Sequence, residues 1–170
     1  MIVNAEQEAR RAAGRFRTRH HLGMQPIGDL VTLMEQTTGH DVAVLDADQD
    51  EHGLTMRGPI RKVVFIGVAR SRNPMRRRST LAHELGHLLF EDWNEDDSFG
   101  SRSPEDVRAD AFARHLLVPV EGVKEFLGHR GSVSESDLSN VVQRFLVSPQ
   151  MATIAMRDYS TSGTPHPLIE

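Results

Sequence analysis

Hydrophobic and polar positions follow a helical period in the first part of the chain. Residues 4–19 carry a weak amphipathic pattern, and residues 28–37 carry a clearer one. Asp29 stands where a helix-capping side chain is preferred, and Gly39 stands where a helix commonly ends. The pattern therefore predicts two helices before the first strand.

Three short stretches then have the composition of β-strands. They are rich in β-branched residues and separated by turn-forming residues, and they cover residues 41–46, 53–57 and 62–69. The short, turn-rich spacing between them is typical of strands that pair with their sequence neighbours. We therefore expect a small, mainly antiparallel three-stranded sheet.

Two strong helix starts follow the predicted sheet. Asn73-Pro74 combines a capping residue with proline at the first helical position, and the helix it opens should run to about Glu91. An acidic loop comes next. Ser103-Pro104 repeats the same start signal, which predicts a second long helix close behind the first.

The remainder of the chain is predicted to form shorter helices. The helix that begins after Ser103 must stop before Pro119, a short helix ends near Gly128, and a helical pair is divided at residues 147–149. This pattern predicts one domain over residues 1–158 and a flexible C-terminal tail over residues 159–170.

Composition narrows the classes of protein to which the chain can belong. With 170 residues it is long enough for one domain with its own core, and its net charge of -4 creates no general attraction to nucleic acid or to an anionic membrane. It has no cysteine, which excludes disulfides and thiolate metal ligands. No apolar run has membrane-spanning length, and the N-terminus lacks the apolar core of a signal peptide, so we expect a cytoplasmic protein.

The segment LAHELGHLLF, residues 81–90, contains the main candidate for chemistry. A helix turns about 100° per residue, so His83 and His87 lie about 40° apart on one face and their imidazoles can reach one ion. Leucines occupy the opposite side at the spacing of a buried stripe. Gly86 lies between the histidines, where a side chain would obstruct the approach to the site. The alternative interpretation is a solvated helix face whose histidines bind nothing.

A zinc peptidase needs a third protein ligand and an open position for water. The position of a third histidine in the longer zincin motif holds another residue type here, so the predicted helix after Ser103 must supply a carboxylate. We expect Asp106 to bind the metal, with Glu105 as the alternative ligand. Asp110, four residues further on, should accept the second ring N–H of a ligand histidine. The competing explanation for Asp106 is a capping box with Ser103.

These segments resemble the ImmA/IrrE family of zinc metallopeptidases. The resemblance rests on RRRSTLAHELGHLL (residues 76–89) and VRADAFARHLLVP (residues 107–119), and a weaker similarity extends over residues 20–157. The family has glutamate where this chain has Asp106, whose side chain is about 1.5 Å shorter in reach. Either the second helix lies closer to the first, or a water intervenes, or Glu105 takes the place of Asp106.

The resemblance implies a fold and a function. The fold would be α+β and zincin-like, with the small sheet packed against a helix-rich body that carries the H-E-x-x-H helix. The function would be zinc-dependent cleavage of an XRE-type helix-turn-helix repressor encoded nearby, which derepresses mobile-element or stress genes. Some related proteins pair with such regulators as toxin and antitoxin, so a catalytically weak binding protein is the alternative. Neither role requires nucleic acid or membrane as a direct partner.

The residues then have defined roles in the expected mechanism. Zinc would be held by His83, His87 and Asp106, and manganese is compatible with the same ligands. Glu84 would take a proton from water and pass it to the leaving amine. By analogy with other zincins, the strand at residues 62–69 would bind an extended substrate by strand addition.

Two further features are assigned less specific roles. Residues 69–78 contain five arginines, which could contact phosphates but are better explained as a solvated helix start that balances the acidic loop. His115 lies about 180° around the helix from Asp106 and should face away from the metal. Peptide hydrolysis also needs a group that stabilises the negative charge that develops on the carbonyl oxygen, and the sequence identifies no residue for this role.

Overall fold

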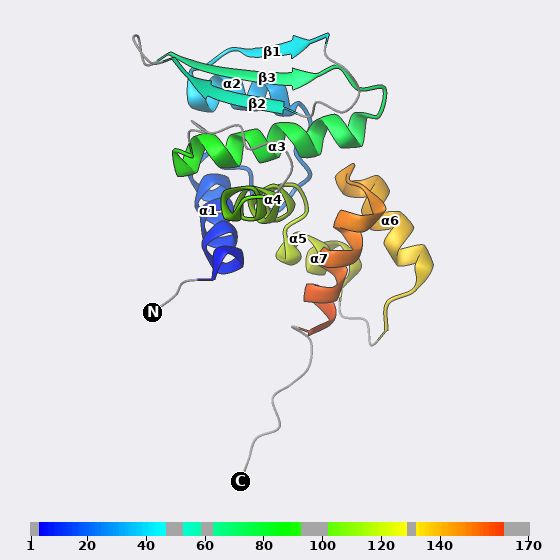
Figure 1. Cartoon of the computed structure of the whole chain (residues 1–170). Helices are drawn as coiled ribbons and strands as arrows, with labels where there is room; N and C mark the ends of the chain where they lie inside the picture. The colour runs from blue at the N-terminus through cyan, green and yellow to red at the C-terminus, as the bar shows by residue number, and fades with distance from the viewer. Residues whose placement is uncertain (1–3, 47–52, 59–62, 93–101, 129–131, 162–170) are drawn as a thin grey trace.

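The structure of the protein is a computed structural model that describes residues 4–46, 53–58, 63–92, 102–128 and 132–161. Within these residues the chain is α+β, as predicted (Figure 1). Its elements, in chain order, are α1 (Ala5–Arg19), α2 (Leu30–Thr38), β1 (Val42–Leu45), β2 (Gly53–Arg57), β3 (Val64–Ala69), α3 (Pro74–Phe90), α4 (Pro104–Leu117), α5 (Val120–Leu127), α6 (Glu135–Phe145) and α7 (Pro149–Thr161). None of the helices described has the length and apolar character needed to cross a bilayer.

The helix ends follow the capping signals in the sequence. The Asp29 side chain accepts a hydrogen bond from the backbone N–H of Thr32 at 3.0 Å, and Gly39 ends α2 with a φ of 72°. Asn73 caps α3, with Pro74 as the first helical residue. The predicted positions of these two helices are therefore confirmed.

The last helix extends further than the sequence pattern predicted. Residues 159–161, at the start of the predicted tail, are the last residues of α7. The reason is tertiary: the Tyr159 ring is buried, and its hydroxyl donates a hydrogen bond to the Gly128 carbonyl at 2.7 Å. Residues 162–170 lie outside the described part, and a tail over them stays a prediction.

The sheet is mixed, with strand order β1-β3-β2. Strands β2 and β3 are antiparallel, as predicted, but β1 runs parallel to β3 with Val42 opposite Ile66. The prediction of a mainly antiparallel sheet is therefore wrong for this pair. Short spacing favours hairpins between sequence neighbours, whereas here β2 lies on the far side of β3, so β1 pairs with the strand after next. Strand β3 is central, and both of its edges are already paired.

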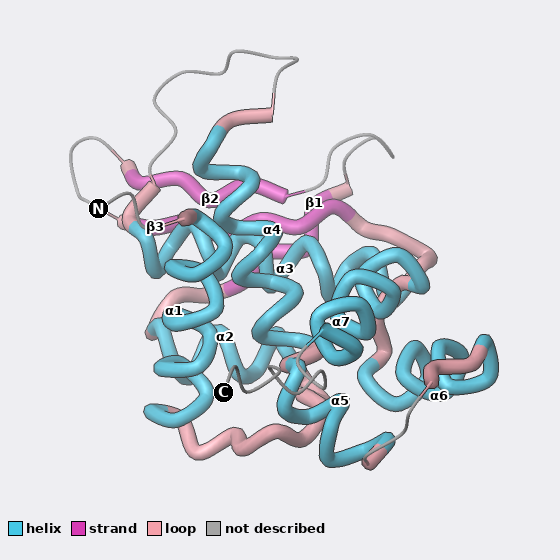
Figure 2. Tube along the Cα trace, turned by 90° about the horizontal axis from the view of Figure 1, so that it is seen from below, coloured by secondary structure: helices cyan, strands magenta, loops and turns pink. Residues whose placement is uncertain are grey.

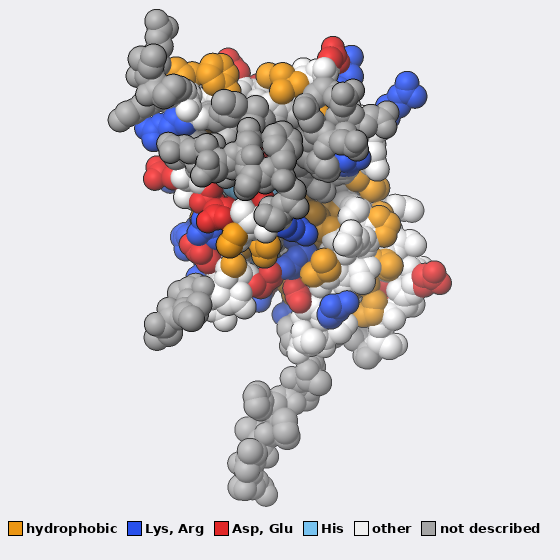
Figure 3. Space-filling model, in the orientation of Figure 1, with side chains coloured by type: hydrophobic (Ala, Val, Ile, Leu, Met, Phe, Trp, Pro, Cys, Tyr) orange, Lys and Arg blue, Asp and Glu red, His pale blue; other side chains and the backbone are white. Residues whose placement is uncertain are grey.

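The sheet forms one outer layer, and α3 lies along its inner face (Figure 1). Ile66 and Val68 of β3 are buried in the same hydrophobic core as Leu81 and Leu85 of α3, which confirms that this face of α3 is a packing face. Phe65 of β3 is 63% exposed. Figure 3 shows hydrophobic side chains along the outer side of the sheet, at the top of the view. Helices α1 and α4 lie on the side of α3 away from the sheet (Figure 1), and the view from below shows α1 and α6 at opposite ends of the molecule (Figure 2).

Gly86 permits a close contact between α3 and α4. A Cβ atom there would lie 3.2 Å from the Ala109 Cα and 3.2 Å from the Phe112 ring. We expected Gly86 to keep the approach to the metal open. In the structure its position is explained instead by the close contact with α4. Close packing against α4 favours a residue without a side chain at this position.

The arginine-rich stretch at residues 69–78 is not a single solvated surface. Arg78 is buried and donates hydrogen bonds to the carbonyls of Ile27, Gly28 and Leu146. It thereby ties α3 to the loop before α2 and to the turn between α6 and α7. A buried arginine with three carbonyl partners holds the fold together, so Arg78 does not belong to a phosphate-binding surface.

Candidate metal centre

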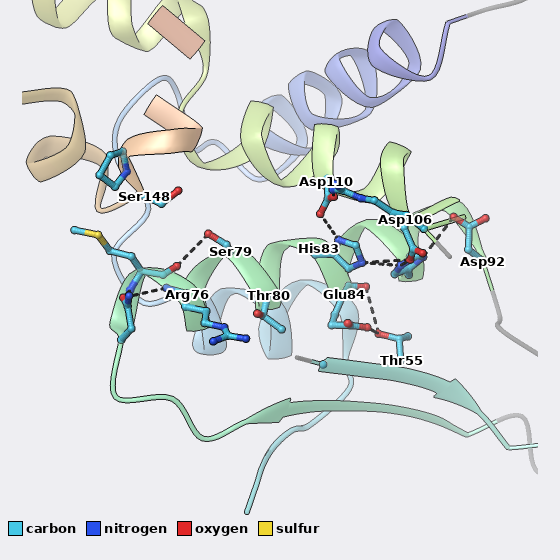
Figure 4. A pocket seen from close by; sticks show the side chains of 16 residues that line it. Thr55, Arg76, Ser79, Thr80, His83, Glu84, Asp92, Asp106, Asp110 and Ser148 are labelled. Atoms are coloured by element: carbon cyan, nitrogen blue, oxygen red, sulfur yellow. Dashed lines mark hydrogen bonds and ion pairs between the residues drawn. The ribbon is translucent and has the colours of Figure 1, made fainter. Parts of the chain in front are cut away.

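Two neighbouring helices bring the three predicted ligands together (Figure 4). The Nε2 atoms of His83 and His87, both on α3, lie 2.9 Å apart. The Asp106 Oδ1 atom, on α4, lies 3.3 Å from the His87 Nε2 and 3.7 Å from the His83 Nε2. These three side chains form a group that could hold a metal ion.

The spacing of these three atoms fits a small divalent cation. A tetrahedral ion with bonds of 2.0–2.1 Å separates neighbouring ligand atoms by about 3.3–3.4 Å. The three distances between the donors lie on both sides of that value. The donor set, two imidazole nitrogens and one carboxylate oxygen, is also one that zinc and manganese accept. The residues present therefore fit the metal that the sequence motif predicted.

Asp110 orients the first of the two imidazoles. Its Oδ1 lies 2.7 Å from the Nδ1 of His83, so a proton on Nδ1 leaves the Nε2 lone pair directed at the other two donors. The contact that we predicted for Asp110 is present. Arg102 pairs with the same carboxylate. Burial lowers the pKa of His83, and Arg102 acts in the same direction, which favours the neutral ring that a metal requires.

The two explanations offered for Asp106 are compatible. Its Oδ2 accepts a hydrogen bond from the Ser103 backbone N–H at 3.0 Å in a capping box, while its Oδ1 faces the imidazoles. Burial acts to raise the pKa of Asp106, but the hydrogen bonds with Ser103 and the nearby histidines outweigh it and keep that pKa low. Glu105, the alternative ligand, is exposed and does not belong to the metal-binding group.

The close contact at Gly86 accounts for the reach of the shorter aspartate. Because the backbone of α4 approaches α3 at Ala109, one turn from Asp106, the carboxylate meets the imidazoles without the extra methylene of glutamate. Of the two carboxylates that the sequence left open, Asp106 rather than Glu105 lies beside the imidazoles.

Glu84 is buried next to the histidines and is held by a residue from the sheet. Its side chain is 5% exposed, and its Oε2 accepts a hydrogen bond from the Thr55 hydroxyl of β2 at 2.5 Å (Figure 4). Burial raises the pKa of Glu84, although the Thr55 hydrogen bond and the histidines act to lower it. A carboxyl with a raised pKa is suited to taking up a proton.

Strand β2 runs very close to Glu84. A Cβ atom at Gly53 would lie 2.6 Å from the Glu84 Oε1, so only glycine fits at this point of the strand. Neither Thr55 nor Gly53 was predicted from the sequence. Nothing in the local pattern connects a strand residue with a helix residue about thirty positions later.

A cleft of about 720 Å³ extends from the candidate ligands along α3. One end is lined by the three ligands and Glu84, and the other by the start of α3 and by Ser148 and Pro149 at the start of α7 (Figure 4). The cleft therefore connects the candidate ligands with the place where the start of α3 meets the start of α7.

His115 and Tyr159 do not line this cleft. The His115 Nε2 lies 2.6 Å from the Glu6 Oε1 on α1, which confirms that the ring points away from the candidate ligands. The hydroxyl of Tyr159 is bonded to the carbonyl of Gly128. Neither side chain is in position to assist the chemistry.

Comparisons with known proteins identify the family of the chain and a similar fold. The peptidase family M78 model, described as the IrrE N-terminal-like domain, matches residues 32–157. No curated protein matches the sequence. A solved structure described as a Mycobacterium tuberculosis transcriptional regulator is similar, with a TM-score of 0.61, 21% sequence identity and coverage of 95% of this chain. The chain spans about half of that protein, 48% of its length, so the likeness supports the fold.

Proposed function

The chain belongs to the ImmA/IrrE family of metallopeptidases, and from this premise we propose that it is a zinc-dependent endopeptidase. The observation that carries the proposal is the convergence of His83, His87 and Asp106 beside a buried glutamate in an open cleft. We interpret the H-E-x-x-H helix beneath a small sheet as the zincin arrangement.

In the proposed mechanism the protein positions one metal and one proton acceptor. Zinc supplies Lewis acidity to such a site, where it polarises a carbonyl and makes water acidic near neutral pH. Glu84 takes the proton of the attacking water and transfers it to the leaving amine. Thr55 holds the Glu84 carboxylate in the required orientation by its hydrogen bond. Asp110 keeps the His83 ring in the tautomer that can bind a cation.

We propose that the substrate binds as an extended chain along β2. Strand addition was predicted for residues 62–69, but β3, which lies within that stretch, is paired on both sides. Within the described residues β2 pairs only with β3, so its other edge offers backbone groups to a peptide. Thr55 of the same strand contacts Glu84, so a chain paired there would pass the proton acceptor.

We further propose that the substrate is an XRE-type helix-turn-helix repressor encoded close to this gene. Membership of the family supports a link with transcriptional control, and the similar solved structure is itself described as a transcriptional regulator. Cleavage of such a repressor would release mobile-element or stress genes from repression.

The experiment that tests the mechanism is Glu84→Gln, assayed by incubating zinc-loaded protein with the neighbouring regulator. The variant should bind zinc as the wild type does and lose at least about a hundredfold in cleavage rate, because the proton acceptor is gone. Glu105→Gln is the matched control, since this neighbouring glutamate is exposed, and it should cleave normally. Cleavage by Glu84→Gln at the wild-type rate would show that Glu84 is not the general base.

The alternative function is a catalytically weak protein that binds a regulator as a toxin–antitoxin partner. The observation that favours it is Asp106 at a position where the family has glutamate. Metal content of the purified protein, together with cleavage before and after a chelator, separates the two functions. The peptidase should contain one equivalent of zinc or manganese and stop cleaving when it is removed, whereas the binding protein should keep its complex with the regulator.

A further inference from the structure

Asp92, just after the C-terminal end of α3, brings a second carboxylate close to the candidate ligand His87. Three buried side-chain atoms in the described residues have no hydrogen-bond partner: His87 Nδ1, Asp92 Oδ2 and Arg108 Nε. The first two face each other at 3.7 Å, and their side chains are 5% and 10% exposed. Buried polar atoms are almost always paired, so a ring nitrogen and a carboxylate oxygen without partners at this separation require an explanation.

We propose that Asp92 is the positioning residue for His87. Ligation through Nε2 requires the ring proton to be on Nδ1, and Asp92 Oδ2 is the acceptor placed to receive it. A shift of about 1 Å in the Asp92 side chain brings the pair to hydrogen-bonding distance. The inference rests on the proposed metal site and adds a residue that no sequence motif identified.

The end of α3 folds Asp92 back towards His87. Its backbone N–H bonds to the His87 carbonyl at 3.0 Å, and the N–H of Glu91 bonds to the Leu88 carbonyl at 3.3 Å. This is a Schellman-type helix end, with Glu91 in the left-handed conformation at a φ of 56°. Glycine is usual at such a position, and a residue with a side chain costs about 1–2 kcal/mol there. The turn therefore places Asp92 over the second ligand of the same helix.

Arg108 holds one oxygen of Asp92 and leaves the other for His87. It donates a hydrogen bond to Asp92 Oδ1 at 2.7 Å, and its guanidinium lies 4.2 Å from the centre of the Phe90 ring. It also donates to Glu8 of α1 at 3.2 Å. Because Arg108 is fixed from three directions, Asp92 has a defined orientation.

Each ligand histidine then has a carboxylate of its own. Asp110 reaches His83 from α4, and Asp92 reaches His87 from the end of α3. Metal-binding histidines commonly donate their second N–H to such a group, which fixes the ring and strengthens the ligand. The competing account is that Asp92 serves only as the ion-pair partner of Arg108.

A measurement of zinc affinity distinguishes between these two roles of Asp92. Asp92→Asn keeps the size of the side chain, and it should bind zinc about 10–100-fold more weakly in a competition with a chromogenic chelator. Asp158→Asn is the matched control, because it also removes a carboxylate from an arginine, Arg114, at a place away from the metal site. The control should bind zinc as the wild type does. Equal affinity of Asp92→Asn and wild type would overturn the inference.

A second measurement needs no variant. In the zinc-loaded wild type, the Nδ1 proton of His87 should give a downfield NMR signal that exchanges slowly with water, as expected for a hydrogen bond to a buried carboxylate. A rapidly exchanging proton at the ordinary imidazole position would overturn the inference even if Asp92→Asn fails to fold. Failure of the wild type to bind zinc would instead refute the proposed function. A wrong role for Asp92 and a wrong proposed function would therefore give different results.

Discussion

The Thr55 hydroxyl reaches Glu84 from the sheet. Glu84 is almost fully buried, and its Oε2 is bonded to that hydroxyl. An ionised carboxylate in such surroundings is costly unless it is hydrogen-bonded. Spacing within the helix predicted Glu84, but Thr55 lies on β2, and only the packing of sheet on helix brings the two together.

Thr55→Val should therefore impair cleavage without removing the metal. Valine has the same shape but cannot donate, so the Glu84 carboxylate loses its partner at a cost of about 1–3 kcal/mol. We expect a cleavage rate at least about tenfold lower, with zinc affinity within about twofold of the wild type, because no ligand is touched. Steady-state cleavage and zinc competition measure the two effects. An unchanged rate would mean that Thr55 does not orient Glu84.

The contact between α3 and α4 decides whether the three ligands can meet. His83 and His87 share one helix, and helical spacing alone places them together. Asp106 belongs to the other helix, and its distance from them depends on how closely the helices approach at Gly86 and Ala109. The sequence marked Gly86 as unusual but did not show that it faces α4.

Gly86→Ala should push the two helices apart and weaken the metal site. The added methyl group would lie 3.2 Å from the Ala109 Cα, so the helices must separate by a few tenths of an ångström. Overpacking of this kind costs about 1–3 kcal/mol, and the separation should also lower zinc affinity. Zinc competition and thermal unfolding of the metal-free protein measure the two effects.

Gly14→Ala is the control for this substitution. It also lies within a helix, α1, but a Cβ atom there meets nothing within 4 Å. Alanine should stabilise the protein by about 0.5–1 kcal/mol and leave zinc affinity unchanged. If Gly86→Ala behaved in the same way as Gly14→Ala, the close contact would not control the metal site.

At the scale of the whole molecule, a buried arginine joins segments that are far apart in the sequence. Arg17 of α1 is 1% exposed and donates hydrogen bonds to the carbonyls of Leu116, Gly23 and Gln25. Burial lowers its pKa to about 10, so it keeps its charge at neutral pH. It connects α1 and the loop after it with the end of α4, the helix that carries Asp106.

Arg17→Met should destabilise the fold strongly. Methionine fills part of the space but leaves three carbonyl oxygens without this donor, and each such loss costs about 1–3 kcal/mol. We expect the free energy of unfolding in urea to fall by at least about 3 kcal/mol. Arg15→Met, on the exposed face of the same helix, should change it by no more than about 0.5 kcal/mol. Similar losses for the two variants would mean that the Arg17 hydrogen bonds contribute little.

Local spacing in the chain was enough to predict the helices, their caps and the H-E-x-x-H pair, because a helix repeats every 3.6 residues and its ends depend on one or two neighbouring side chains. Asp106 could be named because its segment matched a second short motif. The tertiary structure decided the parallel pairing of β1 with β3, the partner of Gly86 and the place of Thr55. Each of these contacts joins two elements that are far apart in the sequence. Their separation is set by packing, so no local pattern predicts it.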